Sequence, residues 1–107
     1  KAAVQGVSRG LAKVLAGSGV TVNAILPGPT RTEGSKKMMA DLAAGRGVTV
    51  EQMEKLFLAE NRPSTLLQRF ATPEEVANMS VYAASPQASA TTGAALRVEG
   101  GIVESIA

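Results

Sequence analysis

The chain has 107 residues, 45% of them hydrophobic, and its 11 basic and 9 acidic residues give a net charge of +2. This length allows one domain at most, and the lack of cysteine and histidine excludes disulfides, thiolate zinc sites and serine–histidine catalysis within these residues. That count does not exclude magnesium or calcium bound by carboxylates, but we expect no metal site. Basic stripes interleaved with aromatic side chains, apolar runs of about 20 residues and a secretory signal pattern are all missing, which favours a cytoplasmic protein that contacts neither nucleic acid nor membrane.

Residues 1–16 are predicted to form a helix, because apolar side chains recur on one face at helical spacing. That apolar face comprises Val4, Val7, Leu11, Val14 and Leu15. A second face carries Gly6 and Gly10, each of which costs about 1 kcal/mol relative to alanine in a helix. Such a smooth face indicates a close neighbour, either the sheet of the same domain, which is slightly favoured, or a second subunit. The pattern opens on Lys1 without a capping residue ahead of it, and we therefore expect a longer parent protein.

Residues 20–26 and 94–99 are predicted to form two strands. Residues 20–26 are largely apolar without polar alternation, apart from Asn23, a pattern typical of parallel strands that helices cover on both faces. Residues 94–99, "AALRVE", are the next candidate strand. Parallel neighbours need a crossover of about a dozen residues or more, and the region between these runs has a mostly helical pattern. We therefore expect the two strands to belong to one parallel sheet.

Further helices are predicted between the two strands. Residues 33–44 carry an apolar side, and Thr49 and Gln52 form a possible capping box for the helix that follows. Thr72 and Pro73 mark the strongest helix start in the chain, because threonine caps well and proline suits the first helical position. The order helix, strand, helices, helix, strand predicts the carboxyl-terminal part of an open α/β sheet.

The first strand runs into the turn "PGPTRT", residues 27–32. In open α/β sheets, ligands bind beyond the carboxyl ends of the strands, where backbone polar groups are free. The two prolines fix the backbone, Gly28 lets a ligand approach closely, and Thr30 and Thr32 offer hydroxyl groups near the next helix start. The turn is therefore a candidate binding site, although a turn of this composition can also serve only to end a strand.

Three blocks, "KAAVQGVSRGLAKVLAGSGVTVNAILPGPTRT", "RFATPEEVANMSVYAAS" and "TTGAALRVEGG", resemble the carboxyl-terminal half of a short-chain dehydrogenase/reductase. They follow that family's order and cover well over half of the chain. The resemblance implies that residues 1–107 form the carboxyl-terminal portion of one NAD(P)-binding, Rossmann-like domain with a doubly wound parallel sheet. Asn23 matches a family asparagine and is expected to bond backbone around the strand end. Glu99 stands where aspartate is more usual, and we expect it to affect packing or subunit contacts more than chemistry.

The resemblance also implies which residues form the active site. Lys1 resembles the family's catalytic lysine, whose ammonium favours the ionised form of a tyrosine phenol and holds the nicotinamide ribose. That tyrosine would lie four residues before Lys1, outside this sequence. The implied cofactor is NAD or NADP, held by Lys1, Pro27, Gly28, Thr30 and Thr32. Backbone near Thr30 would meet the nicotinamide carboxamide, and the Thr32 hydroxyl would bond the carboxamide or the pyrophosphate region.

Residues 33–70 resemble the family's substrate lid. Their methionine and other apolar side chains could close over a substrate, because methionine adapts to varied shapes, or could form permanent core, and the sequence favours neither. The side chains in question are Met38, Met39, Met53, Leu56, Phe57 and Leu58.

The implied parent enzyme interconverts a carbonyl and an alcohol on a small molecule, as a homodimer or homotetramer, and the 107 residues alone are expected to be inactive. One alternative is a 3-oxoacyl-carrier-protein reductase, in which basic side chains attract an acidic carrier. The candidates for that contact are Arg9, Lys13, Arg31, Lys36 and Lys37. The other alternative is a catalytically silent α/β module kept for subunit association.

Overall fold

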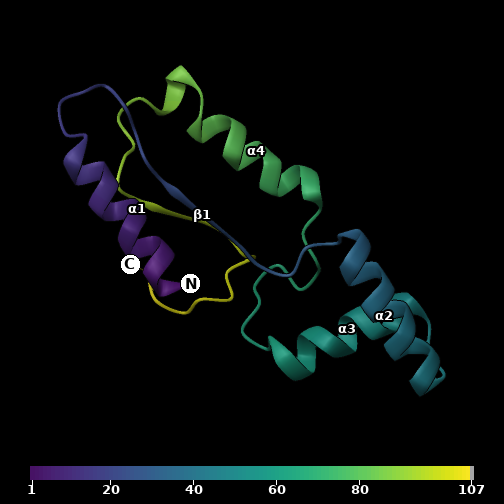
Figure 1. Ribbon diagram of the computed structural model, residues 1–107. Helices are drawn as coiled ribbons and strands as arrows, with labels where there is room; N and C mark the ends of the chain where they lie inside the picture. The colour runs from purple at the N-terminus through teal and green to yellow at the C-terminus, as the bar shows by residue number, and fades with distance from the viewer. Residues whose placement is uncertain (107) are drawn as a thin grey trace.

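The computed structural model describes residues 1–106, and its elements follow the predicted order (Figure 1). A helix and a strand come first, then two helices, a further helix and a second strand. Their bounds are α1 Ala2–Val14, β1 Ala24–Pro27, α2 Glu33–Arg46, α3 Val50–Asn61, α4 Pro73–Ala83 and β2 Ala95–Val98, with the short 3-10 helix η1 Pro86–Ala88 before β2. The predicted succession of helices and strands is therefore confirmed within the described residues.

The two strands pair in parallel, in a register that runs from Ala24 opposite Ala95 to Pro27 opposite Val98. The side-chain amide of Asn23 prepares this pairing, because it donates to the carbonyl of Thr91 at 3.0 Å and accepts the backbone N–H of Ala94 at 3.2 Å. The expected structural role of Asn23 is thereby confirmed. Both strands are shorter than predicted, because ladder pairing covers only four residues of each.

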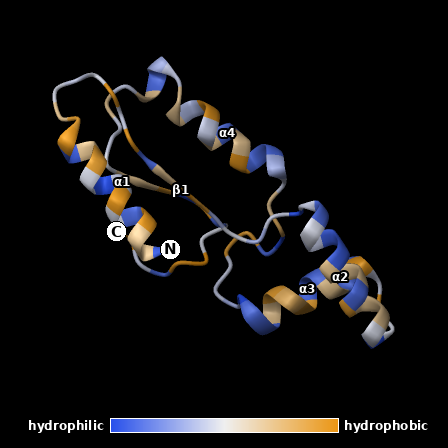
Figure 2. Cartoon of the chain, viewed as in Figure 1, coloured by the Kyte–Doolittle hydropathy of each residue, from blue (hydrophilic) through white to orange (hydrophobic). Residues whose placement is uncertain are grey.

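Helices α1 and α4 lie on opposite sides of the two strands (Figure 1). Apolar bands recur along α1, as Figure 2 shows, yet the face they form is open, with Val7 71% and Val14 80% exposed. A β-carbon added at Gly6 or at Gly10 would meet no described atom within 4 Å. The favoured expectation that the chain's own domain packs closely on this glycine face is therefore not met by residues 1–106.

Helices α2 and α3 form a hairpin at the other end of the molecule (Figure 1). Each begins with a capping box, Thr32 with Ser35 and Thr49 with Gln52, of which the second was predicted. Gly47 closes α2 in the left-handed conformation, with φ of 66°. The hairpin has its own core, which consists of Met39, Ala43, Met53, Leu58 and Phe70.

Helix α4 begins as the sequence predicts. Thr72 accepts the N–H of Glu75, the Glu75 carboxylate accepts the N–H of Thr72 at 2.9 Å, and Pro73 occupies the first turn.

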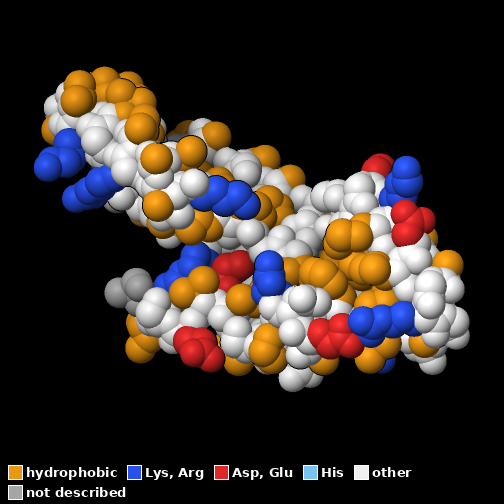
Figure 3. All heavy atoms as spheres, turned by 60° about the horizontal axis from the view of Figure 1, so that its bottom comes forward, with side chains coloured by type: hydrophobic (Ala, Val, Ile, Leu, Met, Phe, Trp, Pro, Cys, Tyr) orange, Lys and Arg blue, Asp and Glu red, His pale blue; other side chains and the backbone are white. Residues whose placement is uncertain are grey.

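The molecule measures 57 × 24 × 21 Å, and many apolar side chains stay exposed in patches on the face that Figure 3 shows. Across residues 1–106, no helix combines the length and apolar character that a membrane crossing requires.

Candidate functional site

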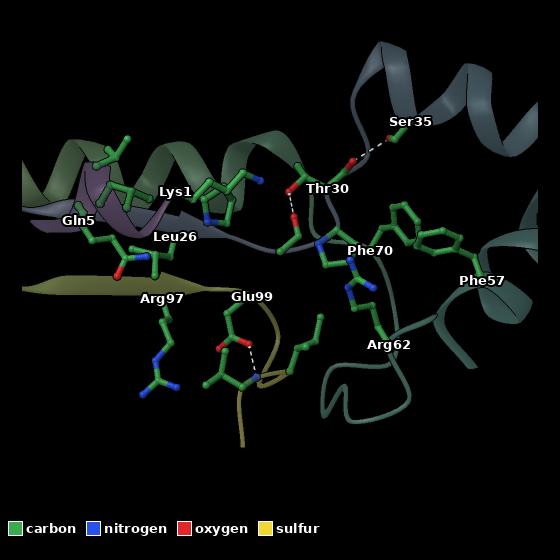
Figure 4. Close-up of a pocket in the computed structure, with 18 of the residues that line it drawn as sticks. Lys1, Gln5, Leu26, Thr30, Ser35, Phe57, Arg62, Phe70, Arg97 and Glu99 are labelled. Carbon is green, nitrogen blue, oxygen red and sulfur yellow. Dashed lines mark hydrogen bonds between the residues drawn. The ribbon is translucent and has the colours of Figure 1, made fainter. Parts of the chain in front are cut away.

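A cavity of about 770 Å³ opens at the carboxyl ends of β1 and β2 (Figure 4). The two strands, the start of α1, the helical hairpin and the segment after β2 all contribute to its wall. Its principal lining residues are Lys1, Gln5, Pro27, Gly28, Thr30, Met38, Phe57, Arg62, Phe70, Arg97 and Glu99. Four of the five predicted site residues, Lys1, Pro27, Gly28 and Thr30, therefore come together in one cavity.

Gly28 lies where the chain leaves β1, and its N–H donates to the carbonyl of Val98 at 3.0 Å. A β-carbon at this position would come 2.7 Å from the Cα of Glu99. Glycine is thus required here by close approach of the two strand ends, a contact within the chain that the sequence did not reveal.

Thr30 is held in place by three hydrogen bonds and one backbone bridge. Its hydroxyl donates to the carbonyl of Gly28 at 2.8 Å, and its carbonyl accepts the Ser35 hydroxyl at 2.7 Å and the N–H of Thr32 at 2.9 Å. A parallel bridge joins it to Ala71. No residue that the structure describes accepts the N–H of Thr30, so a fixed, free donor remains at the edge of the cavity.

Thr32 does not line this cavity. Its side-chain oxygen accepts the N–H of Ser35 at 3.2 Å and so caps α2, and it faces a separate depression beside Thr72 and Glu74. A hydroxyl that accepts one hydrogen bond can still donate its own hydrogen, so the cap and a contact to a ligand are compatible.

The exposed fractions of the hairpin side chains show which methionines belong to the permanent core. Met39 and Met53 are 0% and 1% exposed, and Leu58 is buried with them. Met38 is 44% exposed and lines the cavity, together with Phe57, whose ring centroid lies 5.8 Å from that of Phe70. Met39, Met53 and Leu58 are therefore core, Met38 lines the cavity, and Phe57 both lines the cavity and packs against the core. Leu56, 37% exposed, belongs to neither group.

Two charged residues reach the cavity from β2 and its exit, and sequence reasoning had not placed them there. Glu99 accepts the N–H of Val103 at 2.8 Å, and Arg97 donates to the carbonyls of Ser105 and Ile106, both at 2.9 Å. Their position at the end of the second strand was a usable signal, because the carboxyl ends of parallel neighbours meet at one edge of the sheet.

Arg31, the basic residue of the turn, forms an ion pair within the chain. Arg31 donates to both carboxylate oxygens of Glu54 on α3, at 3.1 and 2.7 Å. The Glu54 carboxylate raises the pKa of the Arg31 guanidinium, chiefly through these hydrogen bonds. Arg31 therefore ties the turn to the hairpin, and its charge is partly offset by Glu54.

Comparison with known proteins gives consistent matches. A family model described as enoyl-(acyl carrier protein) reductase matches residues 1–103. The chain is 45% identical to the oxidoreductase YvaG of Bacillus subtilis, over 94% of this chain and 38% of that protein. It is 35% identical to a D-beta-hydroxybutyrate dehydrogenase of Rhizobium meliloti, again over 94% of this chain and 38% of the relative.

A solved structure extends the similarity to three dimensions. The L-sorbose reductase of Gluconobacter frateurii, complexed with NADPH and L-sorbose, matches with a TM-score of 0.86 and 30% identity, over 98% of this chain and 39% of that one. The predicted Rossmann-like α/β fold is thereby confirmed. The chain spans about two-fifths of the length of these relatives.

Proposed function

Because this chain belongs to the short-chain dehydrogenase/reductase family, we propose that it forms the nicotinamide-clamping and substrate-covering part of an NAD(P)-dependent oxidoreductase that interconverts a carbonyl and an alcohol. One observation supports this function above the others. The free N–H of Thr30 and the side chain of Lys1 share one cavity at the carboxyl ends of parallel strands. A rigid donor and a cation are the groups that a nicotinamide nucleotide needs there.

The residues present fit a nicotinamide nucleotide. The Thr30 N–H is free to donate to the oxygen of the carboxamide, and the ammonium of Lys1 suits the ribose hydroxyls. The Thr32 hydroxyl adds a donor at the helix start, next to backbone N–H groups that favour negative charge. When bound, the nicotinamide supplies or accepts the hydride. We propose NAD or NADP without preference, since the residues that select between them lie outside this sequence.

Lys1 is proposed to act in proton transfer as well as in binding. Its positive charge would lower the pKa of a neighbouring tyrosine phenol, which could then exchange a proton with the substrate oxygen near neutral pH. The tyrosine of the family pattern is not among these 107 residues, and Tyr82 does not line the cavity. We therefore propose that the 107 residues are inactive alone.

Residues 33–70 are proposed to be the substrate lid within the single domain 1–107. Met38 and Phe57 offer the apolar surface that faces the cavity, while the buried Met39 and Met53 belong to the hairpin's own core. A small carbonyl or alcohol would lie between this hairpin and the turn. We further propose a homodimeric or homotetrameric parent in the cytoplasm, for which the open face of α1 is a candidate subunit contact.

A 3-oxoacyl-carrier-protein reductase is the alternative within the family, and the description of the matching family supports it by naming a carrier protein. Arg9, Lys13, Lys36 and Lys37 are the exposed cations for such a carrier. Arg31 is exposed as well but pairs with Glu54, as Lys36 pairs with Glu33, so Arg9, Lys13 and Lys37 are the members without a carboxylate partner among the described residues. A silent association module is the second alternative, and it predicts that the cavity binds no dinucleotide.

The test uses the complete protein that carries these residues. We expect it to bind NADH or NADPH, measured by the fluorescence of the reduced nicotinamide, and to oxidise the bound form when a ketone is added. Lys1→Ala should lower kcat about 100-fold or more, because both proton transfer and ribose binding are lost. Lys13→Ala removes a cation from the same helix outside the cavity and should leave kcat unchanged. Binding of neither cofactor would contradict the proposal.

A further inference from the structure

Arg62 directly follows α3 and lines the cavity beside Phe57 and Phe70 (Figure 4). The only hydrogen bond from its side chain to a described residue is a donation from Nη1 to the carbonyl of its neighbour Asn61, at 2.7 Å. A guanidinium carries five N–H donors. Most of the donors of Arg62 are therefore left without an acceptor within residues 1–106.

The other arginines near the hairpin are compensated. Arg31, Arg46 and Arg69 each hold a carboxylate through two hydrogen bonds, with Glu54, Glu60 and Glu75 respectively. Arg97, which shares the cavity with Arg62, donates to two backbone carbonyls after β2. Of the two described arginines that line the cavity, Arg97 makes two side-chain hydrogen bonds and Arg62 makes one.

The cavity wall carries an excess of positive charge. Among its described lining residues, three are cationic, Lys1, Arg62 and Arg97, whereas Glu99 is the one carboxylate. Glu99 already accepts a backbone N–H, and Lys1 is assigned to the cofactor and the proton transfer. The rings of Phe57 and Phe70 line the same cavity, and a hydrogen bond from a guanidinium to a carboxylate is stronger than one between neutral groups.

We propose that Arg62 binds a carboxylate of the substrate, so that the carbonyl or alcohol substrate is an oxo or hydroxy acid. This inference rests on the proposed function of the cavity. The planar fork of a guanidinium matches the two oxygens of a carboxylate, which makes arginine more selective for such a group than lysine. A thioester-linked acyl chain has no free carboxylate at that end, so the proposal also favours a small acid over a carrier-bound substrate.

The test compares oxo acids with their methyl esters in the complete protein loaded with its reduced cofactor. Pyruvate, acetoacetate and levulinate are the probes, each beside its own ester. For the best acid, we expect kcat/KM to exceed that of the ester about tenfold or more in the unmodified protein. Arg62→Met should lower kcat/KM for the acid about 10- to 100-fold, mainly through KM, the size expected for a hydrogen bond to a charged group. The loss for the ester should be much smaller.

Two further variants separate this role from a structural one. Arg62→Glu should lower kcat/KM for the acid more than Arg62→Met does, because the introduced carboxylate repels the substrate carboxylate. Arg62→Lys keeps the positive charge and should therefore lower kcat/KM less than Arg62→Met does. Arg46→Met breaks a structural pair away from the cavity and should alter acid and ester equally little. Cofactor affinity, read from nicotinamide fluorescence, should not change in any of these variants.

The outcomes distinguish the two proposals. If no acid is preferred to its ester, or if Arg62→Met weakens acid and ester equally, the inference about Arg62 is overturned and the oxidoreductase function stands. The same holds if the variant selectively impairs a carrier-bound thioester. If the protein binds no nicotinamide cofactor, the proposed function itself fails.

Discussion

Gly28 and Glu99 meet where the two strands end, so closely that a β-carbon on Gly28 would lie 2.7 Å from the Cα of Glu99. Gly28→Ala must therefore push backbone against backbone, a contact that no side-chain rotation can relieve. We expect the complete protein to lose about 1–3 kcal/mol of stability, the usual cost of overpacking, measured by urea unfolding. We also expect weaker cofactor binding, because the turn that carries Thr30 would shift.

The matched control is Gly45→Ala within α2. A β-carbon there meets nothing within 4 Å, and alanine is favoured over glycine in a helix by about 0.5–1 kcal/mol. The control should therefore be neutral or slightly stabilising. A Gly28→Ala variant as stable as the Gly45→Ala variant would show that the two strand ends can separate without cost.

Thr32 gives a second prediction, because its capping role and its proposed cofactor contact can be separated. Thr32→Ala should cost about 1 kcal/mol through loss of the cap and should also raise the Kd for NAD(P)H several-fold. Thr49→Ala removes the same kind of capping box from α3, away from the cavity, and should cost similar stability without changing that Kd. Equal Kd values for the two variants would leave Thr32 with a structural role alone.

The capping boxes explain why so much of the fold could be predicted from the sequence. The starts of α3 and α4 depend on hydrogen bonds between residues only three positions apart, so the sequence pattern alone predicts them. The same applies to the turn after β1, where prolines and glycine act locally. Thr32 was recognised as a candidate ligand contact for the same reason, although its pairing with Ser35 was overlooked.

What could not be predicted depends on contacts between distant residues. Arg31 lies 23 positions before its partner Glu54, and nothing local distinguishes it from a free surface cation. The position of Glu99 against Gly28 likewise follows only once the two strands pair. Arg62 was not singled out, because the sequence does not show that Arg31, Arg46 and Arg69 pair with carboxylates and that Arg62 does not.

Met38 and Met39 provide a third prediction, since adjacent residues on a helix point about 100° apart. Met39→Ala empties a fully buried position and should cost about 2–5 kcal/mol of stability, measured by urea unfolding. Met38→Ala removes apolar surface from the cavity wall and should raise the substrate KM several-fold, with a stability change below about 1 kcal/mol. If Met38→Ala destabilised the fold and Met39→Ala raised the substrate KM, the face of α2 that contacts the cavity would be the opposite of the one described.

Glu75 gives a prediction about pH. Its hydrogen bonds to the Arg69 side chain and to the backbone N–H of Thr72 lower its pKa from an ordinary 4.5 to about 2. A carboxylate whose pKa is lower in the folded state stabilises the fold above the unfolded pKa, and that stability is lost as the pH falls through the folded pKa. Glu75→Gln keeps the capping box without the charge.

The gap in stability between the unmodified protein and Glu75→Gln should therefore be full above pH 4.5, shrink between pH 4.5 and about 2, and vanish below that range. Urea unfolding at a series of pH values measures it. Arg69→Met removes the main cause of the lowered pKa and should reproduce the loss over the same range of pH. A gap that stays constant down to pH 2 would contradict this explanation.

The isolated chain of 107 residues is the subject of the last prediction. Its radius of gyration is 16.8 Å, whereas a compact domain of this length would have about 13 Å. The apolar face of α1 is open, and two short strands do not form a stable sheet alone. We expect the purified chain to self-associate on size-exclusion chromatography and to unfold in urea over a broad range. A monomer with a sharp, cooperative transition would show that the hairpin core and the two paired strands are sufficient for a stable fold.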